Sequence, residues 1–373
     1  MPRVAHVITT LDVGGAERLL ADVIRHTDDT VLAVSLRRPG PVAGAVTDAG
    51  VAVRSLDLRR TAAVPTAVHR LAGWLREERI DVVQTWMYHA DLIGGAAARR
   101  AGIGALAWSI HASDLTRGLV PRRTLAIRAV NARLSHRWPQ AVVCTSQRTL
   151  ALHASFGYAT ARMRVIRNGF AVKAPSTAAG RRLRRELGIA PDDLVLARVG
   201  RLDPQKGWGA TVAVWQKLLA HHPRLHVLGC GRGVVPDTEV FSTVTRGPAA
   251  DRLHLLGERD DVDAIHAAAD VAMSTSAFGE SFPLVIGEAM AAVVPVVATD
   301  VGGCAELVGD TGAIVPPGDV AGLTREVDRL LADPERRRTL GARARQRIAE
   351  RFTIEETAAA YAALHRELAE RRR

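Results

Sequence analysis

Short apolar runs alternate with segments of helical periodicity along most of the chain, and this alternation limits the possible folds more than any other feature. Runs such as RVAHVIT at 3–9 are typical of strands, and segments such as 62–79 are typical of helices. A strand–helix–strand order forms βαβ units with parallel strands. It predicts an α/β protein with doubly wound parallel sheets. The other runs predicted as strands lie at 30–36, 81–86, 105–110, 141–146, 193–200, 224–229, 252–257, 270–276, 295–299 and 312–317.

The chain of 373 residues suffices for two such domains of similar size, which we expect at 1–172 and 173–373. Small and polar residues at 174–180 (APSTAAG) indicate a linker. The tail 355–373 is typical of one amphipathic helix, which we expect to return to the first domain. Doubly wound domains hold ligands at the carboxyl ends of their strands, so we expect a site in the cleft between two Rossmann-like domains.

Composition favours a cytoplasmic globular protein. Hydrophobic residues make up 47% of the chain, and no apolar run has the length of a membrane-spanning helix. The first residues lead directly into a predicted strand, so we expect no signal peptide. Cys144, Cys230 and Cys304 follow no metal-binding or redox spacing.

The formal charge of +11 comes from the first half of the chain. Residues 1–172 contain 23 arginines and 12 acids, whereas residues 173–373 contain 27 basic and 27 acidic residues. Such a surplus suggests an acidic partner, or else arginines that are simply solvated. We expect no nucleic-acid function, because only 4% of the residues are aromatic and single-strand binders interleave aromatics with their basic groups.

The segment 117–138 concentrates this charge, with six arginines and no acid. Leu125, Ile127, Val130 and Leu134 could form an apolar face on a helix there. This pattern suggests a peripheral contact with the anionic inner face of a membrane, or an approach surface for a phosphorylated acceptor. An ordinary surface helix is the alternative.

The motif GRLDPQKG at 200–207 directly follows a predicted strand. Arg201 and Lys206 would project from one strand–loop–helix corner, where two cations suit a diphosphate. The chain has only three lysines, so the lysine at 206 argues against an arbitrary surface charge.

The motif ESFPLVIGE at 280–288 places two acids in an apolar stretch. With Pro283 at the first helical position, Glu280 lies in the preceding loop and Glu288 lies about 7.5 Å along the helix axis, since each helical residue rises about 1.5 Å. A nucleoside diphosphate sugar has a comparable span. Glu288 would accept hydrogen bonds from ribose hydroxyls, and the alternative is a buried pair with an arginine.

Three further motifs are weaker. In LDVGGAER, Gly15 would let the backbone approach a phosphate, or it belongs to an ordinary strand-to-helix turn. In SIHASDL, His111 could reach the donor sugar, or it is a structural histidine. The acids of DDVD at 260–263 resemble a metal motif, but we predict a helix start and no metal.

Several of these motifs, in this order, resemble glycosyltransferase family 4, whose members are retaining enzymes with the GT-B fold. The resemblance includes 200–207, 280–288, PVVATDVGG at 295–303 and IVPPGD at 314–319. The run QTWMYHADLIGG at 84–95 resembles bacterial members that build surface polysaccharides. Members usually have glycine where this chain has Val293.

The resemblance implies a role for each candidate residue. Arg201 and Lys206 bind the donor diphosphate, Glu280 holds the donor sugar, and Glu288 holds the ribose. The resemblance also implies that no metal or other cofactor is needed. Further donor contacts are implied for Arg259 near the base, Gly15 near the phosphates, and the backbone around Phe282, Pro283 and Leu284 near the sugar.

We therefore predict a hexosyl- or N-acetylhexosaminyl-transferase that moves a sugar from a nucleotide diphosphate sugar to a hydroxyl acceptor with retention of configuration. The acceptor is a glycan, a lipid-linked molecule or a small molecule. UDP is favoured as the nucleotide, and GDP stays open. Two alternatives remain: a non-catalytic sugar-nucleotide-binding protein of the same fold, and a glycosyltransferase of natural-product biosynthesis.

Overall fold

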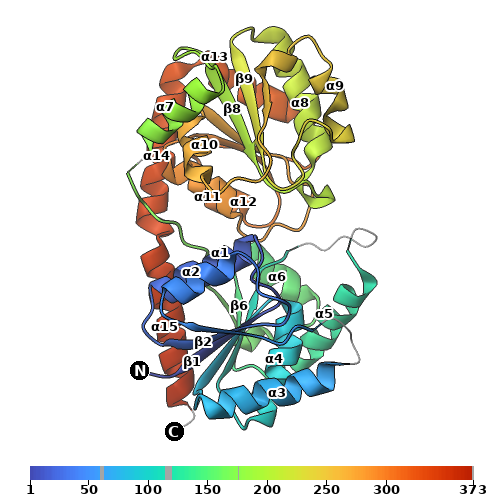
Figure 1. The fold of residues 1–373 in the computed structure, drawn as a ribbon, viewed down its shortest axis with the longest axis vertical. Coiled ribbons are helices and arrows are strands. Elements are labelled where there is room, and N and C mark those ends of the chain that lie inside the picture. Colours follow the sequence, from blue (N-terminus) through green and yellow to red (C-terminus); the bar gives the residue numbers. More distant parts are fainter. Residues whose placement is uncertain (59–62, 114–119, 175, 372–373) are drawn as a thin grey trace. The chain divides into compact units, whose positions relative to one another are not determined.

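The computed structural model describes residues 1–58, 63–113, 120–174 and 176–371 and divides the chain into two compact units (Figure 1). Unit 1 comprises Met1–Gly169 and Ile354–Arg373, and unit 2 comprises Phe170–Thr353. The boundary that we placed after residue 172 therefore falls a few residues inside unit 2.

Unit 1 is built on a seven-stranded parallel sheet in the order β3-β2-β1-β4-β5-β6-β7. Its central strands are buried along their whole length, as expected for a parallel sheet that helices cover on both faces. The strands are β1 (Val4–Ile8), β2 (Thr30–Ser35), β3 (Ala52–Ser55), β4 (Val82–Trp86), β5 (Leu106–Ile110), β6 (Ala141–Cys144) and β7 (Met163–Val165).

Two groups of helices pack on the two faces of this sheet. One hydrophobic cluster joins α3, α4 and α5 to the sheet, and these helices lie next to one another in Figure 1. A second cluster joins α1, α2 and α15 to the sheet. The helices are α1 (Gly15–Arg25), α2 (Val42–Asp48), α3 (Val64–Glu77), α4 (Tyr88–Arg100), α5 (Arg122–Leu134), α6 (Gln147–Ser155) and α15 (Ile354–Glu370).

The terminal helix α15 is a structural part of unit 1. Tyr361, Leu364 and Leu368 belong to the cluster that α1 and α2 also share. The Tyr361 hydroxyl is 3.1 Å from Oγ of Ser109 on β5. His365 Nδ1 is 2.8 Å from a carboxylate oxygen of Asp29.

Unit 2 is built on a six-stranded parallel sheet in the order β10-β9-β8-β11-β12-β13. Helices α8 and α13 share one cluster with the sheet, whereas α7 and α10 share another, and α11, α12 and α14 a third. The strands are β8 (Leu194–Val199), β9 (Leu225–Cys230), β10 (Leu253–Leu255), β11 (Val271–Ser274), β12 (Val296–Thr299) and β13 (Ala313–Val315). The helices are α7 (Thr177–Glu186), α8 (Trp208–His221), α9 (Ser242–Thr245), α10 (Val262–Ala268), α11 (Leu284–Ala291), α12 (Cys304–Val308), α13 (Val320–Ala332) and α14 (Pro334–Arg351).

The predicted fold class is confirmed, since both sheets are parallel and covered by helices. Each run predicted as a strand overlaps one, whereas β3 and β7 are additional. The predicted linker at 174–180 is wrong in its second half, because α7 begins at Thr177. Gly180 lies against α10, where a Cβ atom would be 2.4 Å from the carbonyl oxygen of Ala267.

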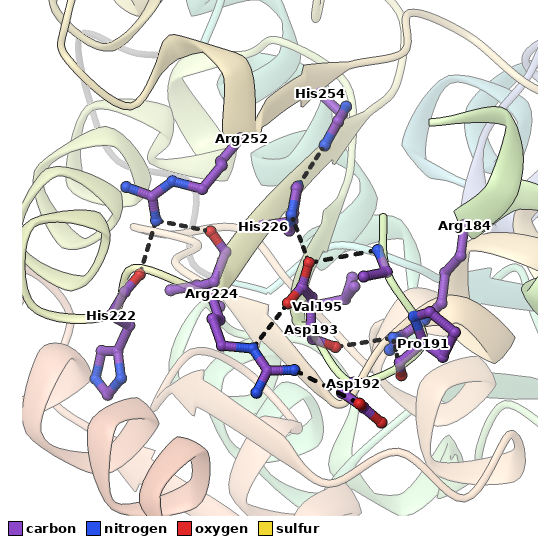
Figure 2. A network of polar contacts seen from close by, with 12 residues as sticks. Arg184, Pro191, Asp192, Asp193, Val195, His222, Arg224, His226, Arg252 and His254 are labelled. Atoms are coloured by element: carbon purple, nitrogen blue, oxygen red, sulfur yellow. Dashed lines mark hydrogen bonds and ion pairs between the residues drawn. The ribbon is translucent and has the colours of Figure 1, made fainter. Parts of the chain in front are cut away.

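A polar network ties the start of β8 to its neighbours (Figure 2). The Asp193 carboxylate accepts a 3.0 Å hydrogen bond from Nε of Arg224, and its other oxygen is 3.4 Å from Nε2 of His226. His226 Nδ1 is in turn 3.0 Å from Nε2 of His254 on β10. Burial and the neighbouring His226 lower the pKa of His254 to about 4. The network therefore holds this sheet edge together, and its His254 ring is neutral at neutral pH.

Val293 connects α11 to β12 with a φ of +68°, in the left-handed region of the backbone. A β-branched residue is strained there. Gly341 of α14 packs against the same turn, and a Cβ atom at 341 would lie 2.0 Å from the Val293 carbonyl oxygen. The backbone of this turn is therefore left-handed at residue 293. Members of the family that the sequence resembles usually have glycine at this position.

Candidate functional site

A charged cluster lies where β8 and β11 end in unit 2. Asp203 caps the short 3₁₀ helix Pro204–Lys206, since its side chain accepts a 2.9 Å hydrogen bond from the Gln205 amide. Gly207 follows with a φ of +65°, and a Cβ atom there would lie 2.1 Å from the Thr275 carbonyl oxygen. Glycine at 207 therefore allows the loop to pack on the end of β11, which brings Lys206 to the loop that follows this strand.

Lys206 and Glu280 form the centre of the cluster. Nζ of Lys206 is 2.5 Å from Oε1 of Glu280, and Oγ of Ser276 donates to the same oxygen over 2.7 Å. The side chains are 17% and 8% exposed, respectively. Burial alone would raise the pKa of Glu280, but Lys206, Ser276 and Arg198 together lower it. Glu280 is thus an ionised hydrogen-bond acceptor at neutral pH rather than a proton donor.

Arg198 was not among the predicted site residues, yet it lies beneath this cluster. It is 1% exposed, one NH2 group donates a 2.8 Å hydrogen bond to the Lys206 carbonyl oxygen, and its guanidinium lies 5.1 Å from the Trp208 ring. Burial lowers the pKa of Arg198 to about 10, whereas Glu280 acts in the opposite direction. The sequence signal was an arginine inside the otherwise apolar strand LVLARV.

Arg201 lies near the cluster but makes different contacts. Its carbonyl oxygen accepts a 2.7 Å hydrogen bond from Nε1 of Trp208, which fixes the backbone of the loop. Its side chain is exposed and forms no ion pair within the part of the chain that the structure describes. The guanidinium is therefore available to an anion from solvent.

The helix after Glu280 begins one residue later than predicted. Pro283 is the N-cap of α11 and Leu284 is its first residue, so the predicted first helical position of Pro283 is wrong by one place. The Phe282 ring is buried between Phe170 and Phe352, with ring centroids 6.3 and 5.4 Å away. Only the backbone of Phe282 can therefore face a ligand.

Glu288 lies in the middle of α11 with a side chain that is 25% exposed. The ion-pair contact that the described residues show for it is to Nε2 of His266 on α10, at 3.9 Å. This separation is too long for a direct hydrogen bond. The two ring nitrogens of His266 are buried and have no hydrogen-bond partner in the structure.

Arg259 precedes α10 and is held by Asp261. Its Nε and NH2 groups lie 2.7 and 2.6 Å from the two carboxylate oxygens. This pairing raises the pKa of Arg259 and lowers that of Asp261. Asp261 is the N-cap residue of α10 and Asp263 lies in its first turn, which confirms the predicted helix start. Over the described residues, no group of three or more His, Cys, Asp or Glu side chains could hold a metal ion.

The remaining two candidates, Gly15 and His111, belong to unit 1. Gly15 is the exposed first residue of α1, and the Glu17 carboxylate folds back so closely that a Cβ atom on Gly14 would lie 2.3 Å from it. His111 follows β5 with its ring stacked 5.0 Å from Trp86. Burial lowers its pKa to about 3, and its Nε2 atom has no hydrogen-bond partner in the structure. His111 is thus a neutral imidazole whose Nε2 atom has no partner among the described residues.

Two sequence profiles match most of the chain. Residues 13–174 match Glycosyltransferase Family 4, and residues 193–333 match Glycosyl transferases group 1. No helix within the described ranges combines the length and the apolar character needed to cross a bilayer.

Individual relatives agree with these profiles. The N-acetyl-alpha-D-glucosaminyl L-malate synthase of Bacillus anthracis is 31% identical over 49% of this chain, which spans about half (48%) of that relative's own length. A GDP-mannose-dependent monoacylated alpha-(1-6)-phosphatidylinositol monomannoside mannosyltransferase of Corynebacterium glutamicum is 28% identical over 76% of each chain.

A solved structure shows the same fold. Anabaena Alr3699/HepE, in complex with UDP and glucose, superposes with a TM-score of 0.84 at 24% identity and covers 97% of this chain and 99% of its own. The likeness confirms the predicted GT-B fold of two parallel-sheet α/β domains.

Proposed function

Because this chain belongs to glycosyltransferase family 4, we propose that it transfers a sugar from a nucleotide diphosphate sugar to a hydroxyl acceptor and retains the anomeric configuration. The observation that carries the proposal is the cluster of Lys206, Glu280 and Arg198 at the ends of β8 and β11. The carboxyl ends of parallel strands are the usual place for nucleotide ligands in doubly wound sheets.

The chemistry of the cluster suits a donor whose leaving group is a diphosphate. Lys206 has three N–H donors, so it can keep Glu280 and also bind a phosphate oxygen. Arg201, exposed on the same loop, adds a second cation. The two together would neutralise the charge that develops on the leaving diphosphate. A phosphate oxygen of that group would assist deprotonation of the attacking hydroxyl on the same face of the sugar.

We assign the two glutamates to opposite ends of the donor. Glu280, ionised and fixed by Lys206 and Ser276, would accept hydrogen bonds from sugar hydroxyls. Glu288, one-quarter exposed on α11, would accept from the ribose, and Arg259 would line the base. The backbone of Phe282, Pro283 and Leu284, Gly15 near the phosphates and His111 near the sugar complete the proposed set.

The nucleotide is proposed as UDP, and GDP stays open. The solved relative HepE is in complex with UDP and glucose, whereas the Corynebacterium relative is GDP-mannose-dependent. Calorimetric titration of the purified chain with UDP-glucose, UDP-N-acetylglucosamine and GDP-mannose, followed by detection of donor turnover, tests the proposal. Binding of a donor without any turnover would favour the alternative of a sugar-nucleotide-binding protein.

We place the reaction in the cytoplasm, at or near the inner face of the membrane. The free thiols Cys144, Cys230 and Cys304 are all buried, which suits a reducing compartment. On α5, Ile127 and Leu134 pack on the core, whereas Val130 is 42% exposed, so the apolar face expected at 117–138 is divided. Residues 117–119 of that segment lie outside the described residues. Flotation with anionic vesicles at low and high salt tests the contact, and failure to float at low salt would exclude it.

A further inference from the structure

Unit 1 contains a cavity of about 460 Å³ at the carboxyl edge of its sheet. This size is within the range of sites that enclose a small molecule. The cavity shares no lining residue with the proposed donor cluster in unit 2. Its lining comes from the segments that follow β1, β2 and β3 and from the beginnings of α3, α4 and α5, and consists of Thr9, Leu36, Arg37, Leu58, Val64, His89, Leu92, Ile93, Arg123, Ala126 and Ile127.

The walls of the cavity are mainly apolar. Leu92 and Ile93 contribute from α4, and Ile127 contributes from α5. The side chains of Leu58, Val64, Leu92 and Ile127 are only partly buried, which means that part of their apolar surface remains uncovered in the folded unit. A ligand with an apolar chain or ring would gain about 25 cal/mol for each Å² of this surface that it removes from water.

The polar groups of the cavity are positive or neutral. Arg37 and Arg123 are exposed, which places their side chains toward solvent at the cavity rim, and neither forms an ion pair within the described part of the chain. Burial, followed by repulsion from Arg123 and Arg37, lowers the pKa of His89. The Thr9 hydroxyl is buried without a hydrogen-bond partner in the structure. The described lining contains no acid.

The position of Arg123 strengthens this charge imbalance. It lies in the first turn of α5, which carries no acidic residue. The amino end of a helix has a partial positive charge, so a cation there is unfavourable and an anion is favourable. An acidic ligand would offset the positive charge of the helix end and of the two arginines.

We propose that this cavity binds an acidic amphiphile, with its apolar part between α4 and α5 and its phosphate or carboxylate at Arg37 and Arg123. Naming this ligand as the sugar acceptor rests on the proposed function, whereas the binding itself does not. The same chemistry is found in a lipid phosphate drawn from a membrane and in a small apolar acid in solution. The Thr9 hydroxyl supplies a hydrogen bond for the ligand.

The test is calorimetric titration of the full chain with octyl phosphate, octanoate, octanol and inorganic phosphate. We expect octyl phosphate to bind at least ten-fold more tightly than octanol or phosphate alone. Affinity along a hexyl, heptyl and octyl series should rise about four-fold for each methylene, which is the gain expected from burying a methylene group. Competition by vesicles that contain an anionic phospholipid identifies a lipid source, and a preference for octanoate without such competition identifies a small soluble acid.

The double variant Arg37→Gln with Arg123→Gln should weaken octyl phosphate binding at least ten-fold. The matched control, Arg38→Gln with Arg133→Gln, removes the same charge from exposed positions outside the cavity and should have little effect. Ala126→Phe, on an exposed face of α5, should fill the cavity and weaken octyl phosphate and octanol alike.

Equal effects of the two double variants, or no gain with chain length, would overturn the cavity proposal. UDP binding to unit 2 is a separate readout, which the cavity variants should leave unchanged. Octyl phosphate binding that follows these expectations, without turnover of any donor, would count against the glycosyltransferase proposal but not against the cavity. Sugar transfer whose acceptor KM is unchanged in the Arg37→Gln, Arg123→Gln variant would contradict the acceptor assignment alone.

Discussion

The two candidate binding regions of this protein differ in how many of their cations have an acidic partner. In unit 2, acids of the same unit neutralise Lys206 and Arg259, at 2.5 and 2.6 Å, and only Arg201 of the proposed set is exposed without an ion pair in the described part of the chain. In unit 1, Arg37 and Arg123 at the cavity have no acidic partner in the described part of the chain. A cluster that is already paired holds its geometry before the ligand arrives. Unpaired cations instead select the ligand by its charge.

Buried histidines also distinguish the two units, through the pH dependence of their stability. We expect this dependence to be the largest of the predicted effects. Burial lowers the pKa of His6 to about 3 and that of His153 to about 4, and both side chains are fully buried in unit 1. The unfolded chain then binds more protons than the native one, so stability is lost as pH falls from about 6.5 toward 4. Each histidine contributes about 1.4 kcal/mol per pH unit. In unit 2, His254 has a comparable pKa, of about 4, but is only partly buried.

Hydrogen exchange measured between pH 7 and 4.5 should therefore show unit 1 opening before unit 2. His153→Gln should reduce this acid sensitivity, since glutamine can still bond to the Tyr88 hydroxyl that now lies 2.6 Å from the ring. His254→Gln serves as the control and should leave unit 1 unchanged. If unit 2 opened at a higher pH than unit 1, this prediction would be wrong.

Replacing Lys206 tests whether the paired cluster binds the donor. Lys206→Ala removes a charge-assisted phosphate contact and should weaken UDP binding by about 1.5–3 kcal/mol, or roughly ten- to 150-fold. It also removes a group that lowers the pKa of Glu280. Lys217→Ala, at an exposed position on α8, is the matched control. If calorimetry gave the two variants equal dissociation constants for UDP, Lys206 would not be a diphosphate-binding residue.

The two glutamates should differ in what they bind. Glu288→Gln should weaken free UDP and the UDP-sugar alike, by about 1 kcal/mol, because ribose is common to both. Glu280→Gln should spare free UDP and mainly lower turnover of the sugar donor. Similar losses of free UDP in both variants would contradict the proposed direction of the donor along α11.

The smallest expected effect concerns backbone strain in unit 2. Val293→Gly should raise the free energy of unfolding by up to about 1 kcal/mol, because glycine adopts the φ of +68° without a Cβ clash. Ala292→Gly, at a neighbouring φ of −82°, should instead lower it by about 0.5–1 kcal/mol. Exchange rates of the amides between α11 and β12 measure both changes, and a stability loss in Val293→Gly would show that the valine side chain outweighs the strain.

The sequence predicted the two sheets because buried parallel strands are continuous apolar runs bounded by helices. It missed β3 and β7, which are short and only partly buried, so they carry little hydrophobic signal. The motif residues Lys206 and Glu280 were found because they lie in compact local patterns, and the structure brings them together. Arg198 was visible only as a charge within an apolar strand.

The cavity of unit 1 could not be found in this way. Its lining comes from six short stretches between Thr9 and Ile127, and only the segments 84–95 and 117–138 among them stand out as motifs in the sequence. Only the meeting of strand ends with the beginnings of α3, α4 and α5 makes them neighbours. The arginine surplus of the first half, and its concentration at 117–138, were the sequence signals that pointed toward an acidic partner there.

The placement of α15 has a consequence for the order in which the protein matures on the ribosome. Unit 1 begins the chain, yet Tyr361, Leu364 and Leu368 of its hydrophobic cluster come from the last helix. Unit 2 is contiguous in sequence, whereas unit 1 needs a helix that is made after unit 2. Unit 1 therefore completes its hydrophobic cluster only after α15 has been made, and until then one face of its sheet is incompletely covered.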